Sequence, residues 1–160
     1  MLLCSMSDKI EPPGILEEFA MRYPILLEKC LMDDIYVGQG WIPIIDNLFS
    51  VIVAPYEKQK WYLTHSDVEE AQKFKEQLEY EKSELPIITQ IKQKYAGLTI
   101  YGRNCNSRVK SLFDFAAAQA SITCEICGDK GEAENAAGFE CVLCPKHYQE
   151  ELARSKQYKF

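Results

Sequence analysis

The chain has 160 residues, the size of one ordinary domain or of a compact domain with a small second module. Hydrophobic residues make up 47% of it and charged residues 26%, so its composition is that of a folded protein and excludes a disordered chain. The formal net charge is −6, which argues against a protein that coats nucleic acid indiscriminately.

Apolar runs in the chain are short. The longest candidate, residues 41–54, is interrupted by a proline and three polar residues and does not reach the roughly 18 apolar residues of a membrane span. The opening Met-Leu-Leu-Cys lacks the basic region and the long apolar run of a signal peptide. We therefore expect a cytoplasmic protein without membrane contact, whose seven cysteines serve as thiols or metal ligands.

The first half of the chain is predicted to be helical. Residues 15–31 place apolar side chains at helical spacing, and Pro24 is expected to kink or restart that helix. Residues 41–54 predict a mostly buried helix at the centre of the core. A capping-box pattern at Ser66–Glu69 begins a polar helix that runs to Lys82.

The pattern changes in the middle of the chain, where apolar and polar residues alternate on both sides of Ala96-Gly97. This alternation predicts a β-hairpin over residues 86–102. The alanine-rich segment 107–121 predicts a further helix, which leads to the cysteine-rich end of the chain. We therefore predict an α+β fold with a core domain over residues 1–121 and a smaller module over residues 122–160.

Four of the seven cysteines lie between Cys124 and Cys144. The sequence Cys124-Glu-Ile-Cys127-Gly is typical of a zinc knuckle, with two thiolates three positions apart and a glycine that lets the backbone turn under a metal. The second pair of ligands is expected among Cys141, Cys144 and His147. Cys141 with Cys144 would give a four-cysteine ribbon, whereas Cys144 with His147 would give a three-cysteine, one-histidine site.

Local sequence favours the pair Cys144 and His147, with Cys141 as the alternative to the histidine. Pro145 suits the first position of a helix, so Cys144 would cap that helix and His147 would lie on the same side in its first turn. A ligand pair at a helix start, preceded by a hairpin whose second strand is residues 139–143, is the arrangement of a treble clef. Four protein ligands leave zinc no open position, which favours structural Zn²⁺ and a protein that is not an enzyme.

Basic residues gather around the predicted hairpin. Residues 51–110 hold ten bases and eight acids, whereas the segments on either side are acidic. Such bases usually keep an exposed face soluble, and the less favoured interpretation is a nucleic-acid site. The bases concerned are Lys92, Lys94, Arg103, Arg108 and Lys110, and further candidate contact residues that packing would explain equally well are Trp41 and Tyr101.

Four stretches, taken together, resemble a known group of proteins. Residues 40–49 and 90–101 are followed by Cys124-Glu-Ile-Cys-Gly and Leu143-Cys-Pro-Lys-His. In this order, over residues 38–150, they resemble a family of small uncharacterised proteins encoded by phages, prophages and their bacterial hosts. Members show Cys-x-x-Cys-Gly followed by Leu-Cys-x-x-His and do not require Cys141. The resemblance therefore implies the ligand set Cys124, Cys127, Cys144 and His147.

This resemblance implies a role without naming an activity. In that family the hairpin turn is usually Gly-Gly, where this chain has Ala96-Gly97. A phage-related origin implies an accessory protein that binds and modulates a host or rival protein, and such proteins include inhibitors of bacterial defence systems. We therefore expect a non-enzymatic protein with structural zinc that binds a protein partner. The alternative is a nucleic-acid-binding regulator that uses the zinc module and the basic segment 92–110.

Overall fold

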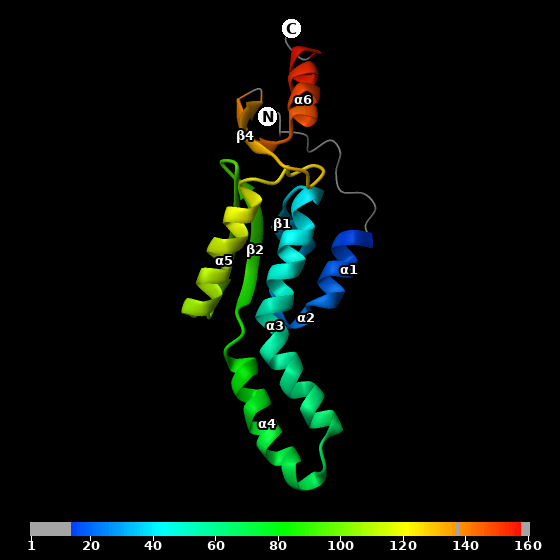
Figure 1. The fold of residues 1–160 in the computed structure, drawn as a ribbon, viewed down its shortest axis with the longest axis vertical. Helices are drawn as coiled ribbons and strands as arrows, with labels where there is room; N and C mark the ends of the chain where they lie inside the picture. Colours follow the sequence, from blue (N-terminus) through cyan, green and yellow to red (C-terminus); the bar gives the residue numbers. More distant parts are fainter. Residues whose placement is uncertain (1–13, 137, 158–160) are drawn as a thin grey trace.

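The structure is a computed structural model that describes residues 14–136 and 138–157, and it confirms the α+β class (Figure 1). Two short 3-10 helices, η1 (Met32–Asp34) and η2 (Gln39–Trp41), lie on either side of the first strand. The other elements, in chain order, are α1 (Gly14–Arg22), α2 (Pro24–Leu27), β1 (Ile35–Tyr36), α3 (Ile42–His65), α4 (Val68–Ser83), β2 (Ile87–Lys94), β3 (Gly97–Arg103), α5 (Ser107–Ala120), β4 (Glu132–Ala136), β5 (Phe139–Leu143) and α6 (Pro145–Gln157).

The first half of helix α3 forms the centre of the main core. Its completely buried Phe49 stacks on Phe19 of α1, with ring centroids 5.3 Å apart. Pro24 separates α1 from α2, as predicted, and the Tyr23 hydroxyl before it donates a hydrogen bond of 2.8 Å to the Asp46 carboxylate of α3. Each large apolar side chain buried here contributes about 1.5–3 kcal/mol, so these contacts anchor the N-terminal helices to α3.

Helix α3 is longer than predicted. We expected it to end at residue 54, but it continues through Pro55 to His65. A proline at this position leaves the carbonyl of Val51 without its helical donor. Arg108 of α5 supplies the missing donor, with Nη2 2.8 Å from the Val51 oxygen. The far end of α3 and α4 together form an arm, residues 56–83, that projects away from the sheet (Figure 1).

The polar helix α4 begins one residue later than the predicted capping box. Asp67 is its N-cap, and the Asp67 carboxylate accepts a hydrogen bond of 3.1 Å from the backbone N–H of Glu70. The Ser66 hydroxyl instead donates to the carbonyl of Tyr62, at the end of α3. The capping-box prediction was wrong because Ser66 closes the preceding helix and does not open the next one.

Strands β2 and β3 form the predicted hairpin, with Ile91 opposite Ile100. The turn residues are Tyr95 and Ala96, whose φ angles are 50° and 57°, and Gly97 already belongs to β3. Two positive φ angles match the turns that follow the twist of a hairpin. Strand β1, which the sequence analysis did not predict, pairs in parallel with β2 and completes a sheet of order β1-β2-β3.

The C-terminal segment adds a second sheet, β4-β5, followed by α6. Val142 of β5 belongs to the main apolar core, whereas its neighbours Cys141 and Leu143 belong to a smaller cluster with Cys124 and Cys144. The division at residues 121 and 122 remains a prediction. Among the described helices, none has both the length and the apolar character needed to span a membrane.

Candidate metal centre

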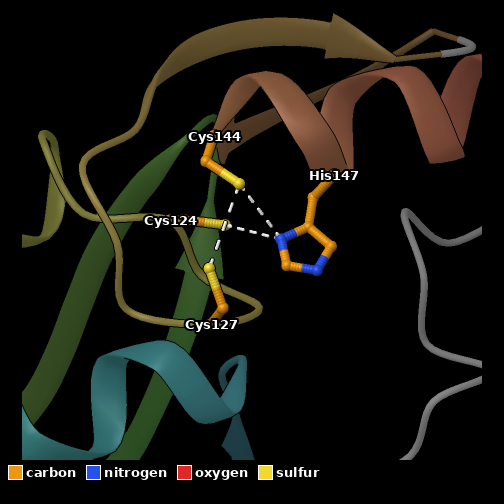
Figure 2. Close-up of side chains that lie close together, drawn as sticks. All are labelled: Cys124, Cys127, Cys144 and His147. Atoms are coloured by element: carbon orange, nitrogen blue, oxygen red, sulfur yellow. Dashed lines mark hydrogen bonds between the residues drawn. The ribbon is translucent and has the colours of Figure 1, made fainter.

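Four side chains predicted as metal ligands lie together in the C-terminal module. The sulfur atoms of Cys124, Cys127 and Cys144 and one imidazole nitrogen of His147 all lie within 4.8 Å of one another. Figure 2 shows that two of these side chains come from the knuckle loop and two from the start of α6, and that all four point to a common centre. Residues separated by more than twenty positions in the chain thus form one cluster.

The distances within the cluster fit a tetrahedral ion. With metal–sulfur bonds of about 2.3 Å, the edges of a tetrahedron are about 3.8 Å between sulfurs, and they are slightly shorter to a nitrogen. The Cys127 and Cys144 sulfurs are 3.9 Å apart. The Nδ1 atom of His147 lies 3.4 Å from the Cys124 sulfur and 3.2 Å from the Cys144 sulfur. These three separations fit a tetrahedral metal with three sulfur ligands and one nitrogen ligand, and donor atoms as far apart as 4.8 Å would close by about 1 Å around it.

The knuckle loop is held by its own backbone. Gly128 has a φ of 83°, in the left-handed region that favours glycine, and its N–H donates a hydrogen bond of 2.9 Å to the carbonyl of Cys124. The N–H of Cys124 donates in turn to the carbonyl of Asp129 at 2.7 Å. These bonds place the two knuckle cysteines on the inside of one tight turn, as the glycine in the sequence indicates.

The second pair of side chains is positioned by the start of α6. The helix begins at Pro145, and the N–H of Tyr148 donates to the carbonyl of Cys144 at 2.9 Å. Backbone N–H groups of the first turn, that of His147 above all, also point at the Cys144 sulfur and lower the pKa of its thiol. The helix start therefore orients both ligands and favours the thiolate form of one of them.

The surroundings of Cys127 disfavour its thiolate form. Desolvation is the main cause that raises the pKa of Cys127 to about 12, and its neighbour Cys124 raises it further. A divalent cation at the centre reverses this effect, because it stabilises each thiolate and deprotonates its ligands on binding. The donor set of the cluster is therefore suited to a metal that prefers thiolate and imidazole.

The second nitrogen of His147 has its own partner. Nε2 lies 3.8 Å from the carboxylate of Glu150, one helical turn further along α6. Carboxylates in this position commonly orient a metal-binding imidazole and fix its tautomer. The His147 side chain is only 12% exposed, so its position within the cluster is also constrained by packing.

Cys141, the alternative fourth ligand, lies outside the cluster, and so does His65, the other histidine of the chain. Cys141 is completely buried in β5 and is disulfide-bonded, so the expectation that every cysteine serves as a thiol or a metal ligand was wrong for this residue. His65 lies at the far end of α3, where its ring stacks on that of Trp61 with centroids 4.3 Å apart. Trp41, a candidate contact residue, is completely buried, so it belongs to the core and not to a binding surface.

The knuckle is docked directly on the segment that leads into α3. The N–H of Gly40 donates a hydrogen bond of 2.9 Å to the carbonyl of Glu125, and the indole nitrogen of Trp41 donates to the carbonyl of Thr123 at 2.8 Å. A Cβ atom at Gly38 would lie only 1.9 Å from the Glu125 oxygen, and one at Gly40 only 2.1 Å from the Cys124 oxygen. Gly38 and Gly40 therefore allow the backbone before α3 to contact the backbone of the knuckle.

This docking surface was not predicted from the sequence. Its signal was present in Gly38-Gln-Gly40, where two glycines bracket one residue just before the buried Trp41. Such a pair indicates a close approach between two backbone segments. The β2-β3 turn makes a second contact with the module, since the N–H of Ala96 donates to the carbonyl of Glu140 at 3.2 Å.

One carboxylate within the knuckle is buried beside the cluster. Glu125 is only 7% exposed, and burial raises the pKa of its side chain to about 7, although the N–H of Val142 donates to it and lowers that pKa in part. The nearby Glu151 raises it further. Glu125 is not among the four clustered donors.

A comparison of the chain with known protein families, with curated proteins and with solved structures finds no match.

Proposed function

We propose that this chain is a non-enzymatic, cytoplasmic binding protein whose C-terminal module, of the treble-clef type, is stabilised by structural Zn²⁺. Zinc is the metal that three thiolates and one imidazole bind most commonly in this geometry. The side chains that would hold it are Cys124, Cys127, Cys144 and His147, whose donor atoms lie within 4.8 Å of one another. The metal would supply charge neutralisation and cross-linking, with no open position for a substrate.

A structural role for zinc is supported by where the cluster lies. The two pairs of ligands join the knuckle to the start of α6, and the knuckle backbone in turn contacts Gly40 and the indole of Trp41. Structural zinc contributes on the order of 10–16 kcal/mol in small zinc modules, more than the few apolar side chains around this cluster provide. Binding zinc would therefore fix the module and the entrance to α3 together.

The proposal that the protein binds a partner rests on the projecting arm, residues 56–83. Helix α4 has no buried residue, so the arm gains little stability from the core of this chain. Trp61 on the arm is 57% exposed and Val68, at the start of α4, is 91% exposed. Exposed tryptophan is the residue most enriched at the centres of protein interfaces. The arm also carries more acidic than basic residues, which suits a partner with a basic surface.

We further propose that the protein is a phage-related accessory factor that inhibits a bacterial defence system. This part rests on the resemblance of the knuckle and of Leu143-Cys-Pro-Lys-His to phage-encoded proteins. An acidic arm that binds a basic protein surface would be a plain means of inhibition, since many defence proteins must bind nucleic acid through such surfaces.

A capture experiment tests partner binding through the arm. Zinc-loaded wild type and the variant Trp61→Ala/Val68→Ser are immobilised and exposed to bacterial lysate, and bound proteins are quantified by mass spectrometry. Phe115→Ala serves as the control, because Phe115 on α5 is 65% exposed but lies outside the arm. We expect a protein that the wild type and the control retain and that the arm variant loses, with the same loss when the purified pair is mixed.

Two results would contradict this proposal. Equal capture by the wild type and the arm variant would exclude the arm as the contact surface. Failure of the wild type to retain any protein above the unloaded resin would exclude protein binding itself. For the proposed inhibitory role, expression of the chain in a bacterium with an active defence system should raise the plating efficiency of phages, and unchanged plating across the defence systems tried would refute it.

A further inference from the structure

The three-stranded sheet differs in charge from the rest of the protein. The chain as a whole has 24 acidic and 18 basic residues, yet strands β1, β2 and β3 contain no aspartate or glutamate. The same strands carry three bases, Lys92, Lys94 and Arg103, together with Tyr36 and Tyr101. The sheet is therefore a local basic and aromatic region in an acidic protein.

The register places these side chains on one face. Residues directly opposite one another in a sheet share a face, as do residues two apart in one strand. Lys92 lies opposite Tyr36 of β1 on one side and opposite Thr99 of β3 on the other. Tyr101 follows two residues after Thr99, and Arg103 two residues after Tyr101. The intervening residues form the opposite face, which is the buried one.

Exposure separates the two faces clearly. On the buried face, Ile35 is 7% exposed and its neighbour Ile91 is completely buried. On the other face, Tyr36 is 46% and Tyr101 is 39% exposed. Tyr101 pairs with Gln90, so it stands two residues further along the sheet than Lys92. With neighbouring strands about 4.8 Å apart and a rise of about 6.8 Å over two residues, the two tyrosines stand about 12 Å apart on a diagonal that passes Lys92. This leaves two aromatic rings accessible to solvent on either side of a cation.

Lys92 and Tyr101 are also in contact with each other. The Lys92 ammonium lies 4.8 Å from the centre of the Tyr101 ring. A positive charge held beside an exposed ring combines the two features by which proteins bind single-stranded nucleic acid: cations for the phosphates and aromatic surfaces on which bases stack. Of the bases predicted to form a patch, Arg108 is excluded because its guanidinium donates to the Val51 carbonyl of α3.

We propose that the exposed face of β1-β2-β3, defined by Tyr36, Lys92, Tyr101 and Arg103, binds single-stranded nucleic acid. Bases stack on the two tyrosines, and the phosphates between them contact Lys92 and Arg103. This surface goes beyond the arm-mediated protein binding proposed above and does not depend on it. Because the chain is acidic overall, binding depends strongly on salt and is confined to this face.

The test measures the binding of zinc-loaded protein to a fluorescein-labelled 15-nucleotide oligo-dT by fluorescence anisotropy, from 25 to 200 mM salt. Tyr101→Ala should weaken binding at least about fivefold, whereas Tyr101→Phe, which keeps the ring, should bind as the wild type does. Lys92→Gln should reduce the slope of log K against log salt by about 0.7, the amount expected for one phosphate contact on a single strand. Matched controls on the arm, Tyr80→Ala and Lys58→Gln, should change neither quantity.

Competitors decide which class of polyanion the face prefers. Unlabelled oligo-dT and oligo-rU should displace the probe, and duplex DNA of the same length should do so far more weakly because its bases cannot stack on the tyrosines. Displacement by polyglutamate as readily as by oligo-dT would overturn the proposal in favour of an acidic protein ligand. The proposal would also be overturned by absence of binding at 25 mM salt or by equal losses in the arm controls. Neither result depends on the capture experiment.

Discussion

Substitution of Gly40 by alanine should separate the metal-binding knuckle from the core. A Cβ atom at this position would lie 2.1 Å from the carbonyl oxygen of Cys124 and 2.5 Å from the backbone nitrogen of Gly128. Both contacts are with backbone atoms, which cannot rotate out of the way as a side chain can. Since ordinary contacts begin at 3.4 Å, the two segments must move apart by about 1.3 Å.

The cost follows from that displacement. Overpacking of this kind costs about 1–3 kcal/mol. A shift of this size also breaks the 2.9 Å hydrogen bond from Gly40 to Glu125 and the 2.8 Å bond from the Trp41 indole to Thr123, at about 1 kcal/mol each. We therefore expect the variant to lose about 3–5 kcal/mol of unfolding free energy, a large part of the 5–15 kcal/mol that domains of this size possess.

Urea unfolding in excess zinc measures this loss. The chain has two tryptophans, so a Trp61→Phe background leaves Trp41 as the single reporter, and Trp41 stands at the contact in question. We expect a lower unfolding midpoint and a red-shifted native emission in Gly40→Ala. Zinc affinity, measured by competition with a chromophoric chelator, should fall together with stability, because docking and metal binding stabilise the same knuckle conformation.

Gly138→Ala is the control for this experiment. Gly138 lies in the β4-β5 turn with a φ of 91°, and a Cβ atom there would meet nothing within 4 Å. Alanine at that position should cost about 1 kcal/mol through backbone strain alone. The reasoning would be refuted if Gly40→Ala lost no more stability than Gly138→Ala, or if it lost stability while the emission of Trp41 stayed unchanged.

Three further predictions concern the core, the pH dependence of stability and the metal. Arg108→Ala should lower the free energy of unfolding in urea by about 1–3 kcal/mol, because it leaves the Val51 carbonyl unpaired. The loss should be smaller in a Pro55→Ala background, where residue 55 regains the N–H that bonds this carbonyl. Equal losses in both backgrounds would contradict this explanation. Burial raises the pKa of the Cys30 thiol from 9.0 to about 11, so the contribution of this thiol to stability is complete below pH 9 and is lost as the pH rises to 11. Cys30→Ala should therefore flatten the fall in melting temperature between pH 9 and 11. An unchanged slope would show that Cys30 does not cause this fall. Removal of metal with a chelator should lower the melting temperature and expose Trp41. Acidification should have the same effect, because the thiolates become protonated and release the metal. An unchanged melting temperature after chelation would contradict a stabilising metal.

The parts of the structure that sequence predicted well depend on residues close together in the chain. The knuckle is specified within Cys124-Glu-Ile-Cys127-Gly, and the helix start at Pro145 brings Cys144 and His147 to one side of α6. Each half of the cluster is therefore determined locally. Their meeting at one centre could be expected because a metal of this kind takes four ligands.

The parts that sequence predicted poorly depend on distant partners. The central helix was predicted over residues 41–54, but α3 continues through Pro55 because Arg108, more than fifty residues away, replaces the hydrogen bond that proline removes. The hairpin turn was placed on Ala96-Gly97, whereas Tyr95 and Ala96 take the positive φ angles and Ala96 bonds to Glu140 of β5. Local propensity does not contain these long-range hydrogen bonds, so it could predict neither outcome.

The most direct test of the account is the metal content of single variants purified without added metal. We predict one zinc ion per chain, by inductively coupled plasma mass spectrometry, in the wild type and in Cys141→Ala. Loss of bound zinc is predicted in Cys124→Ser and in His147→Ala, because their donor atoms belong to the cluster of four. A folded wild type without metal, or zinc that persists in His147→Ala and is lost in Cys141→Ala, would contradict the proposed centre.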